Sequence, residues 1–252
     1  MSNEMEPTPN SQAPNDADQG RTLKYATPLT GIRKAIAEHM VRSLTVSAQL
    51  TYMGEIDASE MVKLREKLIT QGEPNDVRVT YTDIMITAAA RTLREYPLFN
   101  ASLINDELKV WEDINIGVAV NVENGLIVPV VRNADRKSLA EIGREVRTLM
   151  TKARERKLAL SEIQGGTFTI TNFGALGGGY QFATVIINQP EVAILGTGAI
   201  TDRPVARDGQ VVIRPIIPYS LTFDHRVNDG GAALFFMESF TKLVEDPASW
   251  LT

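Results

Sequence analysis

The stretch Pro218-Tyr-Ser-Leu-Thr-Phe-Asp-His-Arg-Val-Asn-Asp-Gly-Gly231 combines the pattern of a β-strand with the first turn of a helix. Residues 219–225 alternate by period two, whereas the apolar residues after Gly231 recur at helical spacing. The pattern places His225 at the end of a strand and Asp229 at a helix N-terminus, where a carboxylate accepts backbone N–H groups. Imidazole is the usual general base for a thiol or hydroxyl. A histidine at the end of a buried strand is also a common core residue, so the stretch alone leaves both interpretations open.

The composition restricts the class of protein. The chain has 252 residues, of which 43% are hydrophobic and 23% charged, as expected for one large or two ordinary soluble domains. A net charge of −5 argues against nucleic-acid binding. The lack of cysteine excludes disulfides and thiolate chemistry, and it fits a cytoplasmic location. Because the chain has two histidines and its carboxylates are scattered, no metal site is predicted. No run approaches the roughly 20 apolar residues of a membrane span, and no signal peptide is indicated.

Periodicity and turn residues predict one α+β or layered α/β domain over residues 23–252, preceded by a disordered polar segment, 1–22. Helices are expected after Thr30 and at 59–69, 80–96, 138–150 and 230–244. The helix at 80–96 is apolar nearly all round, which predicts burial on several sides, and Ser138-Leu-Ala-Glu141 has the spacing of a capping box. Strands are expected at 49–56, 101–104, 107–111, 116–122, 126–131, 167–171, 191–198 and 210–217. Pro129 predicts an edge or bulged strand. The buried stripe of the first helix is predicted to consist of Ile32, Ile36, Met40 and Leu44.

The segment 165–179 contains a second candidate site. Thr167, Thr169 and Thr171 share one face of a short strand, and Phe168 and Ile170 share the other. The glycine-rich run that follows lacks the Gly-Lys-Ser/Thr of a phosphate-binding loop, so tight turns or close backbone approach are the simpler interpretation.

Five motifs carry a family resemblance. They are Gly31-Ile-Arg-Lys-Ala-Ile-Ala37, Gly125-Leu-Ile-Val-Pro-Val-Val-Arg-Asn-Ala-Asp135, Gly166-Thr-Phe-Thr-Ile-Thr-Asn-Phe-Gly174, Ile187-Asn-Gln-Pro-Glu-Val-Ala-Ile-Leu-Gly196 and Asp224-His-Arg-Val-Asn-Asp-Gly230. In this order they resemble the catalytic domain of the dihydrolipoamide acyltransferases of 2-oxo acid dehydrogenase complexes, over about residues 27–252. The resemblance implies an α/β (mixed α+β) fold, the two-layer sandwich with a mixed β-sheet of chloramphenicol acetyltransferase-like, CoA-dependent acyltransferases.

The resemblance also implies roles for the matching residues. His225 would take the thiol proton of coenzyme A or dihydrolipoamide, and the thiolate would attack the acyl thioester. Thr171 would donate to the oxyanion of the tetrahedral intermediate. Asp229 would hold the loop that carries His225 through an arginine, for which Arg33 is the candidate. The implied structural supports are Asn172, Gly174 and Arg226, whereas His39 matches no catalytic position.

The implied assembly is a homotrimer in which His225 of one chain faces Thr171 of the next. In the dehydrogenase complexes that it resembles, such trimers assemble further into cubic or dodecahedral cages. Coenzyme A would be a substrate, and dehydrogenase subunits would be further partners. Relatives usually carry lipoyl and subunit-binding domains before the core. Because only about 22 polar residues precede the core here, and no lipoylation motif Asp-Lys-Ala appears, we expect neither domain and a separate lipoylated protein as partner. Transfer to a small hydroxyl acceptor and a non-catalytic scaffold remain alternatives, and the acyl group and cage type are left open.

Overall fold

The computed structural model describes residues 20–71, 78–123, 125–177 and 179–251, so most of the segment expected to be disordered lies outside these residues. The helices are α1 (Gly31–Val46), α2 (Ser59–Gln71), α3 (Tyr81–Glu95), α4 (Leu139–Arg154) and α5 (Gly230–Glu245). The strands are β1 (Gln49–Asp57), β2 (Ala101–Ile104), β3 (Glu107–Val110), β4 (Ile116–Val118), β5 (Val120–Val122), β6 (Gly125–Ile127), β7 (Val130–Val131), β8 (Phe168–Asn172), β9 (Ala193–Thr197), β10 (Thr201–Arg207) and β11 (Gln210–Asp224).

The main sheet is mixed, as predicted. Its strand order is β1-β11-β9-β8-β4-β7, with β10 paired to β11. β8 runs parallel to β4 and β9, and the other pairs are antiparallel. β7 lies at the edge of this order directly after Pro129, which confirms the edge strand expected from a residue that cannot donate a ladder hydrogen bond.

β11 corrects the sequence interpretation. Residues 210–217 and 218–225 were expected as separate strands, but β11 is continuous from Gln210 to Asp224 and includes Pro215 and Pro218. The prolines are tolerated because they lie where β11 changes partner: β10 pairs with residues 210–216 and β9 with residues 219–223. β10, which contains Pro204, was not predicted, since proline weakens a strand pattern.

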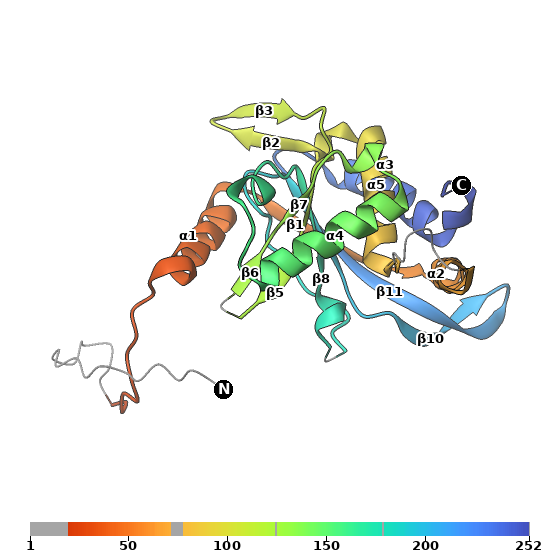
Figure 1. Ribbon diagram of the computed structural model, residues 1–252, viewed down its shortest axis with the longest axis horizontal. Helices are drawn as coiled ribbons and strands as arrows, with labels where there is room; N and C mark the ends of the chain where they lie inside the picture. Colours follow the sequence, from red (N-terminus) through yellow and green to blue (C-terminus); the bar gives the residue numbers. More distant parts are fainter. Residues whose placement is uncertain (1–19, 72–77, 124, 178, 252) are drawn as a thin grey trace.

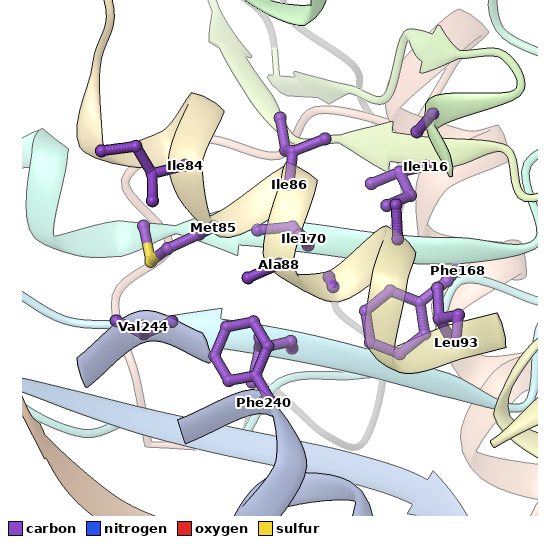
Figure 2. Close-up of a cluster of buried hydrophobic side chains, with 14 of the residues drawn as sticks. Ile84, Met85, Ile86, Ala88, Leu93, Ile116, Phe168, Ile170, Phe240 and Val244 are labelled. Atoms are coloured by element: carbon purple, nitrogen blue, oxygen red, sulfur yellow. The ribbon is translucent and has the colours of Figure 1, made fainter. Parts of the chain in front are cut away.

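One face of the sheet is covered by a layer of helices formed by α2, α3, α4 and α5 (Figure 1). α3 is buried nearly all round, as its sequence predicted, with side chains such as Ile84, Ile86 and Ala88 inside the core. Figure 2 shows side chains of α3, such as Ala88 and Leu93, clustered with Phe168 and Ile170 of β8 and with Phe240 of α5. Burying each large apolar side chain stabilises the fold by about 1.5–3 kcal/mol relative to exposure, so this layer carries most of the fold's stability.

α1 lies apart from this layer (Figure 1). Its helix was predicted correctly, but the expected buried stripe is wrong at its ends: Ile32 and Leu44 are 55% and 56% exposed, and Ile36 and Met40 are half-buried. The residue that is fully buried is Ser43, whose Oγ donates to the carbonyl of Ile187 at 2.6 Å. The apolar spacing is helical, but in the described part of this chain no element covers both ends of the stripe.

Helix starts and turns follow their local sequence signals. Ser138 and Glu141 form the predicted capping box at the start of α4, and Thr80 and Asp83 form another at the start of α3. Asn105 and Asp106 have positive φ in the tight turn between β2 and β3. None of the described helices is long and apolar enough to cross a membrane.

Candidate active site

The turn after β11 presents His225 at the end of the strand, as predicted. Asp224 is buried, and its carboxylate is held by the guanidinium of Arg226, with Nη2 to Oδ2 at 2.6 Å and Nε to Oδ1 at 3.0 Å. The same Oδ1 accepts the N–H of Ala48 at 3.3 Å, and the N–H of His225 donates to the carbonyl of Ala48 at 2.8 Å. The imidazole itself is exposed, 6.1 Å from the ring of Phe223. The turn is therefore rigid while its histidine stays accessible.

Asp229 caps α5, as the sequence predicted. Its Oδ1 accepts the N–H of Ala232 at 2.8 Å. The preceding Asn228 is buried and donates from Nδ2 to the carbonyl of Leu98 at 3.1 Å, which ties the turn to the helical layer. Sequence reasoning missed Asn228, because its partner lies far away in the chain.

Arg33 lies at a different part of the molecule from the expected partner. It lines a hollow beside the β5–β6 hairpin, whereas Asp229 lies at the start of α5. The arginine that fixes the histidine turn within this chain is Arg226, through Asp224. A pairing of Arg33 with Asp229 stays a prediction.

Asn172 and Gly174 shape the turn after β8. Asn172 Oδ1 accepts the N–H of Ala175 at 3.0 Å, and its Nδ2 donates to the hydroxyl of Thr82 at 3.2 Å. A Cβ on Gly174 would lie 2.2 Å from the backbone N of Ala199, so this position has no room for a side chain. These contacts are those of structural supports. Gly174 permits close backbone approach, whereas Gly177 and Gly179 have positive φ, as in tight turns.

Thr171 lines a cavity of about 900 Å³ between the sheet and α1. We call the side of the sheet that faces this cavity the threonine face, and define it by Thr51, Thr169, Thr171, Ser220 and Thr222. The cavity is mostly apolar, with a few polar side chains, and its lining includes Ile36, His39, Met40, Val128, Gln164, Thr169, Thr171, Val185, Asn188 and Ile194. A hydroxyl at the edge of an apolar cavity can donate to an oxygen that gains negative charge during a reaction.

His225 and Thr171 do not meet within one chain. Thr171 lies opposite Gly196 of β9, and Gly196 lies opposite Ser220 of β11. His225 follows Ser220 by four further strand positions and the turn, so the two residues are separated by at least about 13 Å at 3.3 Å per residue. A reaction that uses both side chains needs two chains.

A buried polar network beside Thr171 was missed by sequence reasoning. Asn188 Nδ2 donates to Glu191 Oε1 at 3.2 Å, and the Thr169 hydroxyl lies 2.7 Å from Glu191 Oε2. His39, which was expected to be structural, places Nε2 3.1 Å from Asn188 Oδ1 and lines the cavity. Burial raises the pKa of Glu191 to about 8, against the lowering effect of its hydrogen bonds to Thr169 and Asn188. A glutamate in the apolar run 191–196 was the one signal that could have revealed it.

No group of three metal-ligating side chains is present among the described residues. What the geometry provides is an exposed imidazole on a rigid turn and, elsewhere in the chain, a hydroxyl-edged apolar cavity. An exposed imidazole can transfer a proton, and a hydroxyl beside an apolar cavity can stabilise an oxyanion.

A mixed sheet covered by one helical layer is the architecture of the chloramphenicol acetyltransferase-like fold. A solved chloramphenicol acetyltransferase shares this fold at a TM-score of 0.51 with 17% identity, over 83% of this chain and 92% of that chain. The chain belongs to the family described as 2-oxoacid dehydrogenases acyltransferase (catalytic domain), whose model matches residues 23–252.

Individual relatives agree with this assignment. The chain is 41% identical over 233 residues to the dihydrolipoyllysine-residue acetyltransferase component of the pyruvate dehydrogenase complex of Bacillus subtilis, covering 92% of this chain and 52% of the relative. It is 39% identical over 228 residues to the dihydrolipoyllysine-residue succinyltransferase component of the 2-oxoglutarate dehydrogenase complex of Haemophilus influenzae, covering 89% of this chain and 54% of the relative. The chain thus spans about half the length of these curated relatives.

Solved structures of such cores superpose closely. A dihydrolipoamide acetyltransferase of Azotobacter vinelandii, studied for the catalytic role of a serine, a histidine and an asparagine, has a TM-score of 0.86 and 34% identity, covering 98% of this chain and all of that chain. The cubic core of a pyruvate dehydrogenase multienzyme complex is similar to the same degree.

Proposed function

We propose that this chain is the catalytic core of a dihydrolipoamide acyltransferase, which moves an acyl group between a dihydrolipoyl group and coenzyme A. The observation that carries the proposal is the rigid turn that exposes His225, in a chain of this family. The spacing of residues supports it. In the Azotobacter vinelandii enzyme the studied asparagine follows the histidine by 4 positions and the serine precedes it by 52. Here Asp229 follows His225 by 4 positions and Thr171 precedes it by 54.

The reaction uses the two side chains in sequence. The imidazole of His225 takes the proton of the attacking thiol, because a free thiol with a pKa of about 8.5 is mostly protonated at neutral pH. The thiolate adds to the thioester carbonyl, and the Thr171 hydroxyl donates to the resulting oxyanion. The intermediate collapses by breaking the bond to the original sulfur, which recovers the proton from the imidazolium. Asp229 acts indirectly, by capping the helix that follows the turn.

We further propose that the active site forms between chains of a homotrimer, with His225 from one chain and Thr171 from its neighbour. The separation of these residues within one chain supports this, as does the exposure of Ile32 and Leu44 on α1. Assembly of trimers into a larger cage is supported by the likeness to a cubic core. A lipoyl group as acyl carrier, dehydrogenase subunits as partners and a cytoplasmic location belong to the same proposal.

The test is acyl transfer from acetyl-, succinyl- or isobutyryl-coenzyme A to dihydrolipoamide, with wild type and His225→Ala in parallel. We expect transfer that depends on His225, and the preferred acyl group identifies the complex served. If wild type transfers none of these groups, the acyltransferase proposal is wrong. Particle mass distinguishes a trimer from a cage in the same preparation.

A further inference from the structure

His39 is the second of the two histidines of the chain, and it lies where the proposed reaction would take place. Its ring lines the Thr171 cavity, and it also lines the neighbouring hollow that contains Arg226, next to His225 in sequence. It comes from α1, an element that contributes little to the main core. The side chain is half-buried, so part of the ring is available to a ligand.

The orientation of this ring is set by a chain of hydrogen bonds that ends in a buried acid. Asn188 presents Oδ1 to His39 Nε2 at 3.1 Å and Nδ2 to Glu191 Oε1 at 3.2 Å. Glu191 is 2% exposed and is held from its other oxygen by Thr169 at 2.7 Å. A Cβ on Gly166 would lie 2.9 Å from Glu191 Oε1, so a glycine provides the room for this carboxyl.

The network determines which nitrogen of His39 carries its proton. Glu191 Oε1 accepts from Asn188 in the ionised acid and in a neutral acid protonated at Oε2, so the amide of Asn188 keeps one orientation in both states. The contact of Asn188 Nδ2 with the Thr169 hydroxyl at 3.4 Å agrees with this orientation. In this orientation Asn188 Oδ1 is an acceptor, to which a neutral His39 donates from Nε2. Neutral imidazole has one donor and one acceptor nitrogen, so Nδ1 keeps its lone pair for a hydrogen-bond donor.

We propose that His39 is a ligand-binding residue of the Thr171 cavity, which accepts an amide N–H of a thiol carrier at Nδ1, and that Asn188 is the residue that positions it. The inference rests on the proposed acyl transfer and adds a contact to it. The remainder of the cavity is largely apolar and suits methylene chains, while an amide group within such a chain needs a polar partner. Two carriers offer this chemistry: the pantetheine arm of coenzyme A and the amide of dihydrolipoamide.

The variants separate ligand binding from folding. His39→Phe keeps a ring of similar shape and removes both nitrogens, and His39→Gln restores an acceptor. Asn188→Leu removes the positioning contact. Glu38→Gln, one residue away on the exposed side of α1, is the matched control, because its contact is an exposed ion pair with Lys34 at 3.8 Å.

We expect His39→Phe to raise the KM of one thiol carrier about tenfold with kcat within about twofold, since one hydrogen bond to a ligand is lost. His39→Gln should recover most of this loss. Asn188→Leu should raise the same KM, and the double variant His39→Phe/Asn188→Leu should be no worse than His39→Phe, because both changes remove one interaction. The carrier whose KM changes, coenzyme A or dihydrolipoamide, identifies the source of the amide.

Calorimetric titration of coenzyme A alone and dihydrolipoamide alone gives the same comparison without catalysis. If wild type catalyses no transfer but His39→Phe still weakens binding about tenfold, the acyltransferase proposal fails and the His39 contact stands. If wild type is active and His39→Phe binds both carriers as wild type does, the His39 proposal is wrong. Additive effects in the double variant would overturn the positioning role of Asn188.

Discussion

The two faces of the central sheet carry opposite kinds of side chain, although they are built from the same strands. One cross-strand row on the helix-covered face consists of Ile170, Leu195 and Leu221, all fully buried. The adjacent row on the threonine face consists of Thr169, Ile194 and Thr222. The first face forms the core with α3 and α5, whereas the second holds the cavity and the polar network. Because side chains alternate along a strand, the same strands place the stabilising core on the helix-covered face and the polar site residues on the threonine face.

The turn at the end of β11 lies at the rim of both faces and should give the largest effect on activity. We expect His225→Ala to lower kcat about 10³–10⁴-fold, since a general base is lost. The free energy of unfolding should change little, because the imidazole is exposed and the turn is held by Asp224 and Arg226. Steady-state kinetics and urea unfolding measure the two effects. Turnover near that of wild type would remove the general-base assignment.

On the helix-covered face we expect a change in stability without a change in chemistry. Phe236 is fully buried, with its ring centroid 4.5 Å from that of Phe99 and 6.0 Å from that of Phe168. Phe236→Ala should lower the free energy of unfolding by about 3–5 kcal/mol through lost burial and the cavity left behind. Its neighbour Phe235 is 60% exposed, so Phe235→Ala is the matched control and should have little effect on monomer stability. An equal loss in both variants would contradict the packing described here.

At Thr171 on the threonine face we expect the reverse, a loss of activity without a loss of stability. Thr171→Val keeps the shape of the side chain and removes its hydroxyl, and it should lower kcat about 10²–10³-fold with a smaller change in KM if the hydroxyl acts on the oxyanion. Thr171→Ser should retain most of the activity. Melting curves of both variants should match that of wild type. An effect confined to KM would indicate that Thr171 binds the ground state instead.

Glu191 gives the threonine face a pH-dependent contribution to stability. Burial raises its pKa from 4.5 to about 8, so the folded state binds a proton that the unfolded state releases above pH 4.5. Its contribution to stability is fully present below about pH 4.5 and is lost as the pH rises to about 8, by roughly 3 kcal/mol between pH 5 and pH 8. The free energies of unfolding of wild type and Glu191→Gln, plotted against pH, should therefore converge or cross over this range. Glu238→Gln, at an exposed position, is the control, and its free energy of unfolding should run parallel to that of wild type. A constant difference between wild type and Glu191→Gln across this range would rule out the buried neutral acid.

The smallest effect is expected at the cap of α5. Asp229→Ala should lower the free energy of unfolding by about 1 kcal/mol, because the N–H of Ala232 loses its acceptor. We also expect lower activity, since the cap adjoins the turn of His225. Asp229→Asn should keep both the stability and the activity of wild type, because an asparagine also caps a helix. A stable but inactive alanine variant would mean that Asp229 serves the reaction in another way.

Local sequence signals predicted most of the secondary structure. Capping residues marked the starts of α4 and α5, the period-two pattern placed Thr171 and Phe168 on opposite faces of β8, and the apolar surface of α3 predicted its burial. The signals failed where a distant partner decides the outcome. β11 continues through Pro215 and Pro218 because its neighbours change there, and Ile32 and Leu44 stay exposed because no described element of the chain covers them.

The sequence by itself therefore determined most of the elements, the turn that carries His225 and the cap at Asp229, because these depend on residues within a few positions of one another. The tertiary structure alone decided that His225 and Thr171 lie far apart in one chain, and that Glu191, Asn188 and His39 form one network. These outcomes depend on strand order and register, which bring together residues separated by more than 100 positions, such as His39 and Asn188. Hydrogen bonds of this kind leave no period in the sequence, so only the folded chain reveals them.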